Sequence, residues 1–258
     1  MKERTDSERN YGDVDVLKFK FSGIPIGRLL ESSTNLSEDQ KTREGLNKAS
    51  KALKKGGLII LDTHHARFDV LATGINILRQ LNIDRCIIPS SIKNLNNPLL
   101  KDFYEGLNKI KGLELFPTYR KAEYVSEDEK KMYENMNEEE RLDKNNEYIV
   151  RATEILKEPK SIVFLAVYGG FNRPYGGTIP HGVEKILKTG NPAICTLSVY
   201  GKRFLPITTY LSNDLISFDK NSQNSDMYKT ITKEHKRIAE RVGFSKDYFE
   251  YKNNNAIK

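Results

Sequence analysis

Hydrophobic residues along this chain gather into short continuous runs that alternate with stretches of mixed polarity. The runs at residues 58–62, 161–168 and 193–200 are flanked by glycine, proline or charged residues, and each predicts a buried β-strand. Shorter runs at 86–89 and within 112–120 predict further strands. Residues 204–211 predict a hairpin partner for the strand at 193–200.

The stretches between these runs carry apolar residues at helical spacing. Helices are expected at 38–53, from near Phe68 onward, and at 99–110, 147–157, 183–187 and 228–242. Strands that alternate with helices predict an α/β fold. We expect a single domain over residues 38–252, built on a central mixed, largely parallel β-sheet flanked by helices.

Some segments depart from this alternation. Residues 1–37 are expected to form a loosely structured arm, and residues 253–258 a frayed tail. Acidic and basic side chains dominate residues 121–146, which predicts an exposed helical insertion too charged to enter a core. A lid over the substrate is the alternative interpretation of this insertion.

Composition favours a soluble domain of ordinary surface polarity, with 30% charged residues among 258. No apolar run approaches the roughly 18 residues that a membrane span needs. The charged N-terminus lacks the apolar core of a signal peptide, so a cytoplasmic location is expected. Cys86 and Cys195 lie in apolar runs, which predicts buried free thiols, and two cysteines exclude a cysteine-type zinc site.

The formal net charge of +7 favours anionic partners such as a membrane surface, a phosphate-bearing substrate or nucleic acid. The basic residues are spread along the chain. No arginine-rich arm, zinc finger or aromatic RNA-binding block accompanies them, so we expect no nucleic-acid partner.

The candidate chemistry follows the strand at 58–62. His64 comes directly after that strand, and Asp69 falls in the first turn of the next helix. Open α/β sheets usually carry their functional groups at such carboxyl ends. A carboxylate that reaches the imidazole would fix its tautomer and stabilise the imidazolium, as a general base acting on a hydroxyl requires. The alternative is structural, because both residues could simply cap the helix.

His64-x-x-x-x-Asp69 resembles the first block of the glycerolipid acyltransferase family, which includes the lysophosphatidic acid and glycerol-3-phosphate acyltransferases. That block reads Asn-His-x-x-x-x-Asp, and Thr63 stands here in place of the asparagine. His65 is one residue too close to Asp69 to fit. The segment ending at Arg120 is similar to the second block, Phe-Ile-x-Arg, whose arginine contacts the phosphate of the acceptor.

The third block of that family is a buried strand followed by Pro-Glu-Gly-Thr-Arg-Ser, and the strand at 161–168 with its glycine-rich sequel resembles it. The glutamate is absent, since Tyr168 or Gly169 stands at its place, with Gly170 next. Arg173 corresponds to one of the arginines. The strand at 193–200 is similar to the fourth block. The blocks occur in the family's order over residues 56–200, more than half of the chain.

The resemblance implies an acyltransferase that moves a fatty acyl chain from an acyl-CoA or acyl-carrier-protein thioester to a hydroxyl of a lysophospholipid or glycerol-phosphate-like acceptor. It implies His64 as general base, Asp69 as its orienting partner, and no cofactor or metal. The acceptor's anionic group would be held by Arg120, Tyr168, Gly169, Gly170 and Arg173. Peripheral contact with the inner face of an anionic membrane through the N-terminal arm is expected, because no spanning segment exists to reach a lipid acceptor.

Two other functions remain open. Asp62-x-His64 imitates the Asp-x-His that opens the calcineurin-like metal-dependent phosphoesterases, although the Gly-Asp and Gly-Asn-His blocks they need are not found downstream. The missing glutamate of the third block suggests instead a non-catalytic, lipid-binding descendant of the acyltransferase family.

Overall fold

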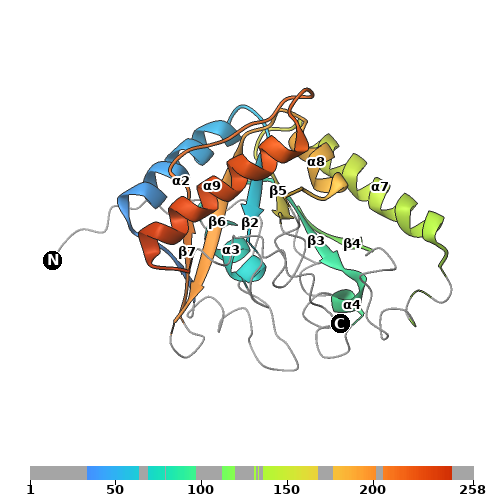
Figure 1. Cartoon of the computed structure of the whole chain (residues 1–258), viewed down its shortest axis with the longest axis horizontal. Helices are drawn as coiled ribbons and strands as arrows, with labels where there is room; N and C mark the ends of the chain where they lie inside the picture. The colour runs from blue at the N-terminus through green and yellow to red at the C-terminus, as the bar shows by residue number, and fades with distance from the viewer. Residues whose placement is uncertain are drawn as a thin grey trace.

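The protein is built around one seven-stranded sheet with the strand order β1-β7-β6-β2-β5-β3-β4 (Figure 1). The computed structural model describes residues 34–63, 69–78, 80–96, 112–119, 131, 133, 136–167, 177–201 and 206–245. The strands are β1 (Thr34–Leu36), β2 (Leu58–Asp62), β3 (Arg85–Ser91), β4 (Leu113–Thr118), β5 (Ser161–Ala166), β6 (Ala193–Tyr200) and β7 (Ile207–Leu211). The pair β6–β7 is antiparallel and every other pair in the sheet is parallel.

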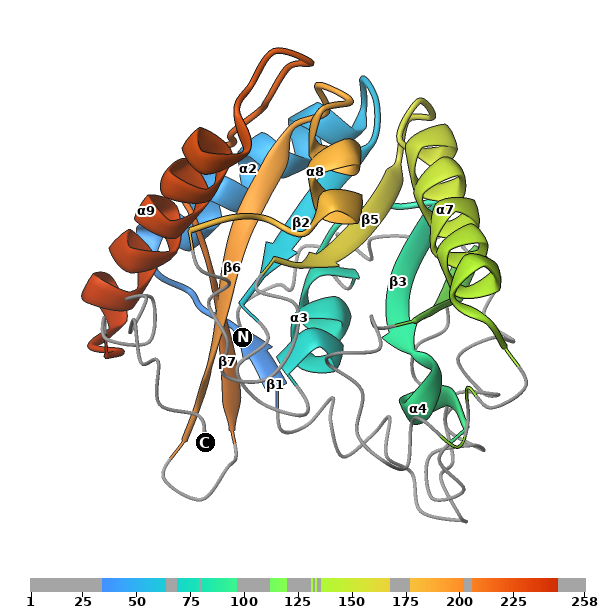
Figure 2. The same ribbon diagram turned by 45° about the vertical axis from the view of Figure 1, so that its right-hand side comes forward.

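Helices cover both faces of the sheet (Figure 2). They are α2 (Gln40–Leu53), α3 (Asp69–Leu78), α4 (Ile92–Leu95), α7 (Glu138–Ile155), α8 (His181–Leu187) and α9 (Asn224–Val242). One apolar layer lies between the sheet and α2 with α3, and the other between the sheet and α7, α8 and α9. Strand β2 contributes Leu58 and Ile60 to the first layer and Ile59 and Leu61 to the second, so it lies at the centre of both.

This architecture confirms the predicted α/β class, with a central mixed and largely parallel sheet flanked by helices. The hairpin between β6 and β7 is also confirmed. Strand β1 was not predicted, and it lies within the segment that we assigned to the arm. It has only three residues, too few for a recognisable pattern, and pairs in parallel with β7.

The helix predicted at 147–157 is longer at its amino end, because α7 begins at Glu138. Asn137 accepts a hydrogen bond from the backbone of Glu140, whose side chain accepts one from the Asn137 backbone, and this capping box starts the helix. The last part of the charged segment 121–146 is therefore the first half of a regular helix. Most of that segment before residue 136 and the predicted helix at 99–110 lie outside the described residues.

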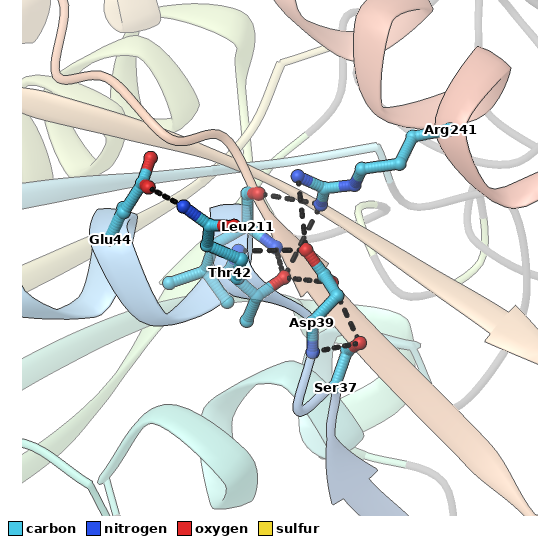
Figure 3. Close-up of polar contacts among 7 residues, drawn as sticks. Ser37, Asp39, Thr42, Glu44, Leu211 and Arg241 are labelled. Carbon is cyan, nitrogen blue, oxygen red and sulfur yellow. Dashed lines mark hydrogen bonds and ion pairs between the residues drawn. The ribbon is translucent and has the colours of Figure 1, made fainter.

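Helix α2 is tied to the end of the sheet by a charged cap (Figure 3). The Asp39 carboxylate accepts hydrogen bonds from the Thr42 backbone at 3.0 Å and from the hydroxyls of Thr42 and Ser37, each at 2.7 Å. The Arg241 guanidinium lies 3.5 Å from the same carboxylate and donates at 2.8 Å to the backbone carbonyl of Leu211. One carboxylate thus joins the start of α2 to α9 and β7.

We expect Asp39→Asn to lower the stability of the protein near neutral pH by about 1 kcal/mol. The amide oxygen can still accept from the Thr42 backbone, but the amide nitrogen carries no negative charge and cannot accept from the hydroxyls of Thr42 and Ser37. Burial by itself raises the pKa of the Asp39 carboxyl, but the hydrogen bonds from Thr42 and Ser37, together with Arg241, outweigh it and lower the pKa below 3.8. A lowered pKa means that the contribution is complete above 3.8 and disappears as pH falls through the folded-state value.

Urea unfolding of both chains over a range of pH measures this contribution. The stability difference between wild type and Asp39→Asn should shrink on going from about pH 5 to about pH 3. A difference that stays constant over this range would show that the charge of Asp39 contributes nothing.

The two cysteines are free and buried, as predicted, and they lie in different layers. Cys86 packs on the side of α2 and α3, and Cys195 on the side of α7, α8 and α9. Among the helices of the described residues, none is long and apolar enough to cross a membrane.

Candidate functional site

The order of the strands brings three of the candidate blocks together. Strand β2 lies between β5 and β6, and its last residue, Asp62, is in register with Ala166 of β5 and Thr196 of β6. These strands are parallel, so their carboxyl ends meet at one edge of the sheet. The segments after β2 and β5, which carry the first and third blocks, therefore leave the sheet from neighbouring strands, and the fourth block flanks them.

The second block leaves the sheet farther away. Strand β4, which precedes Arg120, is separated from β2 by β5 and β3. At about 4.8 Å between neighbouring strands, the end of β4 lies roughly 14 Å across the sheet from the end of β2. The strand that precedes Arg120 thus ends at the same edge of the sheet as the strand that precedes His64, but the two strands are not adjacent.

The candidate side chains themselves belong to segments that the structure does not describe. His64, Arg120, Tyr168, Gly169, Gly170 and Arg173 lie outside the described residues. Asp69 is the first residue of α3, as the sequence predicted for the first turn of that helix, and its side chain also lies outside the description. The predicted contact between His64 and Asp69 therefore stays a prediction.

The end of β2 is held by buried side-chain hydrogen bonds. Asp62 is 1% exposed, and its Oδ1 accepts from the hydroxyl of Thr196 at 2.8 Å and from that of Thr73 at 3.2 Å. Thr196 belongs to β6 and Thr73 to α3, so a single carboxylate oxygen joins β2 to its neighbouring strand and to the helix that follows it. The segment between Asp62 and α3, which contains His64, begins and ends at elements joined by this contact.

A second contact holds the same strand end from the opposite layer. The ring nitrogen Nε2 of His235, on α9, lies 3.1 Å from the backbone carbonyl oxygen of Leu61. His235 is completely buried. The carboxyl end of β2 is therefore fixed from both of its faces.

The segment after β5 is anchored in a similar way. The backbone nitrogen of Val167 donates to the carbonyl of Asp62 at 3.2 Å, which couples its start to the end of β2. At its far end, the amide side chain of Asn224 accepts from the Ile179 nitrogen at 2.7 Å and donates to the Ile179 carbonyl at 2.9 Å. Both candidate segments thus have fixed ends.

Asn224 is itself held by a charged partner. Its Nδ2 donates at 2.7 Å to Glu184, which also pairs with Lys188 at 2.7 Å. These two hydrogen bonds, the one from Lys188 first, lower the pKa of the Glu184 carboxyl below its ordinary value. The carboxylate therefore stays charged, and it orients the amide that holds Ile179.

Neither cysteine is suited to nucleophilic chemistry. Burial raises the pKa of both thiols, and Glu114 near Cys86 and Glu234 near Cys195 raise them further. A protonated thiol is a weak nucleophile. Chemistry at the edge formed by β2, β5 and β6 therefore has to come from other groups.

The described residues contain no set of side chains suited to binding a metal ion. Among residues 34–63, 69–78, 80–96, 112–119, 136–167, 177–201 and 206–245, no group of three or more His, Cys, Asp or Glu side chains could hold a metal ion. The Oδ1 atom of Asp62 is engaged by two hydroxyls. The phosphoesterase interpretation needs Asp62 and His64 to converge, and it stays a prediction because His64 is not described.

An open pocket of about 680 Å³ lies at the other edge of the sheet, before the starts of β2 and β6. Lys48, Lys51 and Lys55 line one wall, and the turn from Thr189 to Pro192 lines another. Lys48 pairs with Asp214 at 2.5 Å. Because this pocket adjoins the amino ends of the strands, it is separate from the edge that carries the candidate blocks.

Sequence reasoning missed the side chains that hold the candidate segments. Asp62 was considered only as a metal ligand, and Thr73, Thr196 and Asn224 were not considered at all. A signal existed for two of them, since Asp62 ends an otherwise apolar strand and Thr73 interrupts an apolar helix. A polar side chain at a buried position is expected to have a hydrogen-bond partner, which these two residues could have pointed to.

Comparison with known proteins assigns no family. The sequence matches no protein-family model, and no curated protein matches it significantly.

Proposed function

We propose that the protein is an acyltransferase that moves a fatty acyl chain from a thioester to a hydroxyl of a phosphate-bearing acceptor. The donor is an acyl-CoA or an acyl-carrier protein, and the acceptor a lysophospholipid or a glycerol-phosphate-like molecule. The observation that carries the proposal is the adjacency of β5, β2 and β6, because the segments of the first and third blocks follow neighbouring parallel strands.

In the proposed reaction His64 accepts the proton of the acceptor hydroxyl as its oxygen attacks the thioester carbonyl carbon. Asp69 keeps the imidazole in one tautomer and balances its positive charge. The tetrahedral intermediate then collapses, the carbon–sulfur bond breaks, and the imidazolium returns the proton to the leaving thiolate. Transfer is direct, since the mechanism uses no serine or cysteine nucleophile.

The acceptor's anionic group is assigned to the backbone and side chains of the third block. Gly169 and Gly170 would let backbone amides approach a phosphate closely, and Tyr168 and Arg173 would add donors. Arg120 starts from β4 and would reach the acceptor from the far side of β5. The absent glutamate leaves these arginines one counter-charge short, which favours a strongly anionic acceptor.

The test measures release of free thiol from the acyl donor in the presence of the purified protein. Acyl-CoA and acyl-carrier protein are supplied separately as donors, with glycerol 3-phosphate in solution or lysophosphatidic acid in anionic vesicles as acceptor. We expect thiol release that depends on the acceptor hydroxyl and is lost when a deoxy analogue replaces the acceptor.

Two outcomes would contradict the proposal. No acceptor-dependent release with any pair, together with binding of lysophospholipid, would favour the non-catalytic descendant. Metal-dependent hydrolysis of a phosphomonoester that Asp62→Asn abolishes would favour the phosphoesterase.

Peripheral association with the inner face of an anionic membrane is part of the proposal, since the lipid acceptors are found there. Lys18, Phe19, Lys20 and Phe21 of the N-terminal arm supply the alternating basic and apolar residues, and they lie outside the described residues. The vesicle arm of the same assay gives the readout. Protein that floats with anionic vesicles at low salt and not at high salt supports this association, and protein that never floats contradicts it.

A further inference from the structure

A row of buried polar side chains crosses the sheet beneath α3, on a face that is mostly apolar. It joins, in spatial order, Asn76, Thr209, Ser198, Thr73 and Asp62. The members come from β7, β6, α3 and β2, and each is at most 2% exposed. Around them the same layer consists of leucine, isoleucine and other apolar side chains.

The hydrogen bonds of this row have one consistent direction. The Asn76 amide can only donate from Nδ2, and it donates at 3.0 Å to the Thr209 hydroxyl. Thr209 lies 2.9 Å from Ser198, and Ser198 lies 2.8 Å from Thr73, which donates to Asp62 at 3.2 Å. Each hydroxyl has one proton to give. With a donor fixed at one end and an acceptor at the other, every hydroxyl donates once toward Asp62 and accepts once from behind.

Burying such a row is unfavourable unless every member forms hydrogen bonds, because a buried polar group without a partner destabilises the fold by roughly 1–3 kcal/mol. Apolar side chains could pack α3 onto the sheet without the free-energy penalty of burying polar groups. They would not have fixed its position, since apolar contacts have no direction. The hydrogen bonds set where α3 lies along the sheet and relative to the end of β2.

We propose that Thr73 and Asp62 are positioning residues for the segment that carries the His64-x-x-x-x-Asp69 motif. The last residue of β2 and the helix that begins at Asp69 are joined side chain to side chain by this pair. The distance that residues 63–68 must span is thereby set. Thr73 follows Asp69 by one helical turn, so the hydrogen bond acts close to the start of the helix. The expected effect of this hydrogen bond on turnover rests on the proposed function. Its expected effect on the segment between β2 and α3 does not.

The test compares Thr73→Val with Thr42→Val. Both threonines are completely buried, and both donate to an aspartate, Thr42 to Asp39 at 2.7 Å. The hydrogen bonds of the Thr42 hydroxyl run to Asp39, Leu211 and Arg241, which lie on neither β2 nor α3. The two variants make the same chemical change, and each deletes a hydrogen bond from a buried threonine to a carboxylate, but only Thr73→Val deletes the link between β2 and α3.

The first readout is hydrogen exchange of the amides of residues 63–69 in the full chain. We expect exchange about tenfold faster in Thr73→Val, no change there in Thr42→Val, and near wild-type exchange in Thr73→Ser, which restores the hydroxyl. If Thr73→Val does not fold, Thr73→Ala and Thr42→Ala, which also lack the hydroxyl, take the places of the two valine variants. Unchanged exchange at 63–69, or equal acceleration in Thr42→Val, would overturn the inference.

The second readout is turnover. In Thr73→Val kcat should fall by about 10- to 100-fold with KM changed less than about threefold, since a displacement of about 1 Å can cost on the order of 100-fold. Thr42→Val should keep wild-type turnover at a temperature where it is folded. An inactive wild type would refute the proposed function and leave the exchange comparison to decide the positioning role. Turnover lost equally in both valine variants would refute that role.

Discussion

His64→Ala should lower kcat for acyl transfer by about 10²- to 10⁴-fold, the usual contribution of a general base, and leave the KM values for donor and acceptor little changed. The alanine cannot take the hydroxyl proton, so attack on the thioester would need solvent as base. A residual rate above the uncatalysed one is expected, because the binding groups of the acceptor and the backbone of the site persist. Single-turnover thiol release at saturating substrates measures the effect.

The control is His65→Ala, which removes the neighbouring imidazole. His65 is one residue too close to Asp69 to fit the motif, so this variant should keep activity within about threefold of wild type. If instead His65→Ala is inactive and His64→Ala active, the assignment of the base is wrong. If both retain full activity, neither imidazole is the base and the proposed mechanism fails.

Gly45→Ala should destabilise the protein by about 2–4 kcal/mol, although alanine is by nearly 1 kcal/mol the better helix former. Gly45 lies on the buried face of α2, where the helix backbone approaches the end of β7. A Cβ atom there would meet the carbonyl oxygen of Ser212 at 2.0 Å and its carbon at 3.1 Å. Because both are backbone atoms, the helix itself would have to move away from the sheet.

Gly182→Ala is the matched control for this substitution. Gly182 is also helical, but a Cβ at its position would meet only the side chain of Ile149, at 3.4 Å. Its free energy of unfolding should therefore change by less than about 1 kcal/mol, with the sign favouring alanine. Urea midpoints of the two variants give the comparison, and equal midpoints would contradict the close approach of α2 to Ser212.

Continuous apolar runs were sufficient to find the central strands. Residues 58–62 are buried on both faces of the sheet. Their sequence is therefore a continuous apolar run, without the alternation of apolar and polar residues that marks a strand with one face in solvent. The three residues of β1 were missed because they form a strand only through pairing with β7, a contact between positions about 170 residues apart. The strand order was also outside the reach of a local pattern, since it depends on which strands pair.

In the candidate site, too, local sequence patterns reveal some residues, and long-range contacts determine the others. His64 and Asp69 could be picked out because they are close in sequence and follow a strand. The partners of Asp62 could not be assigned to it, because Thr196 lies 134 residues away and Thr73 eleven. Thr73 stands out as a polar residue in an apolar helix, but nothing local shows that it donates to that carboxylate. The separation of β4, the strand before Arg120, from β2 is likewise a consequence of the order β2-β5-β3-β4, which no local pattern reveals.

The placement of the two thiols gives the molecule a built-in reporter of its own opening. Cys86 and Cys195 are sealed in opposite apolar layers, and a reagent that attacks thiols can reach each one only when its layer parts from the sheet. Alkylation rates at the two sulfurs would therefore distinguish loss of the α2 and α3 layer from loss of the α7, α8 and α9 layer. The wild-type sequence needs no added probe for that measurement.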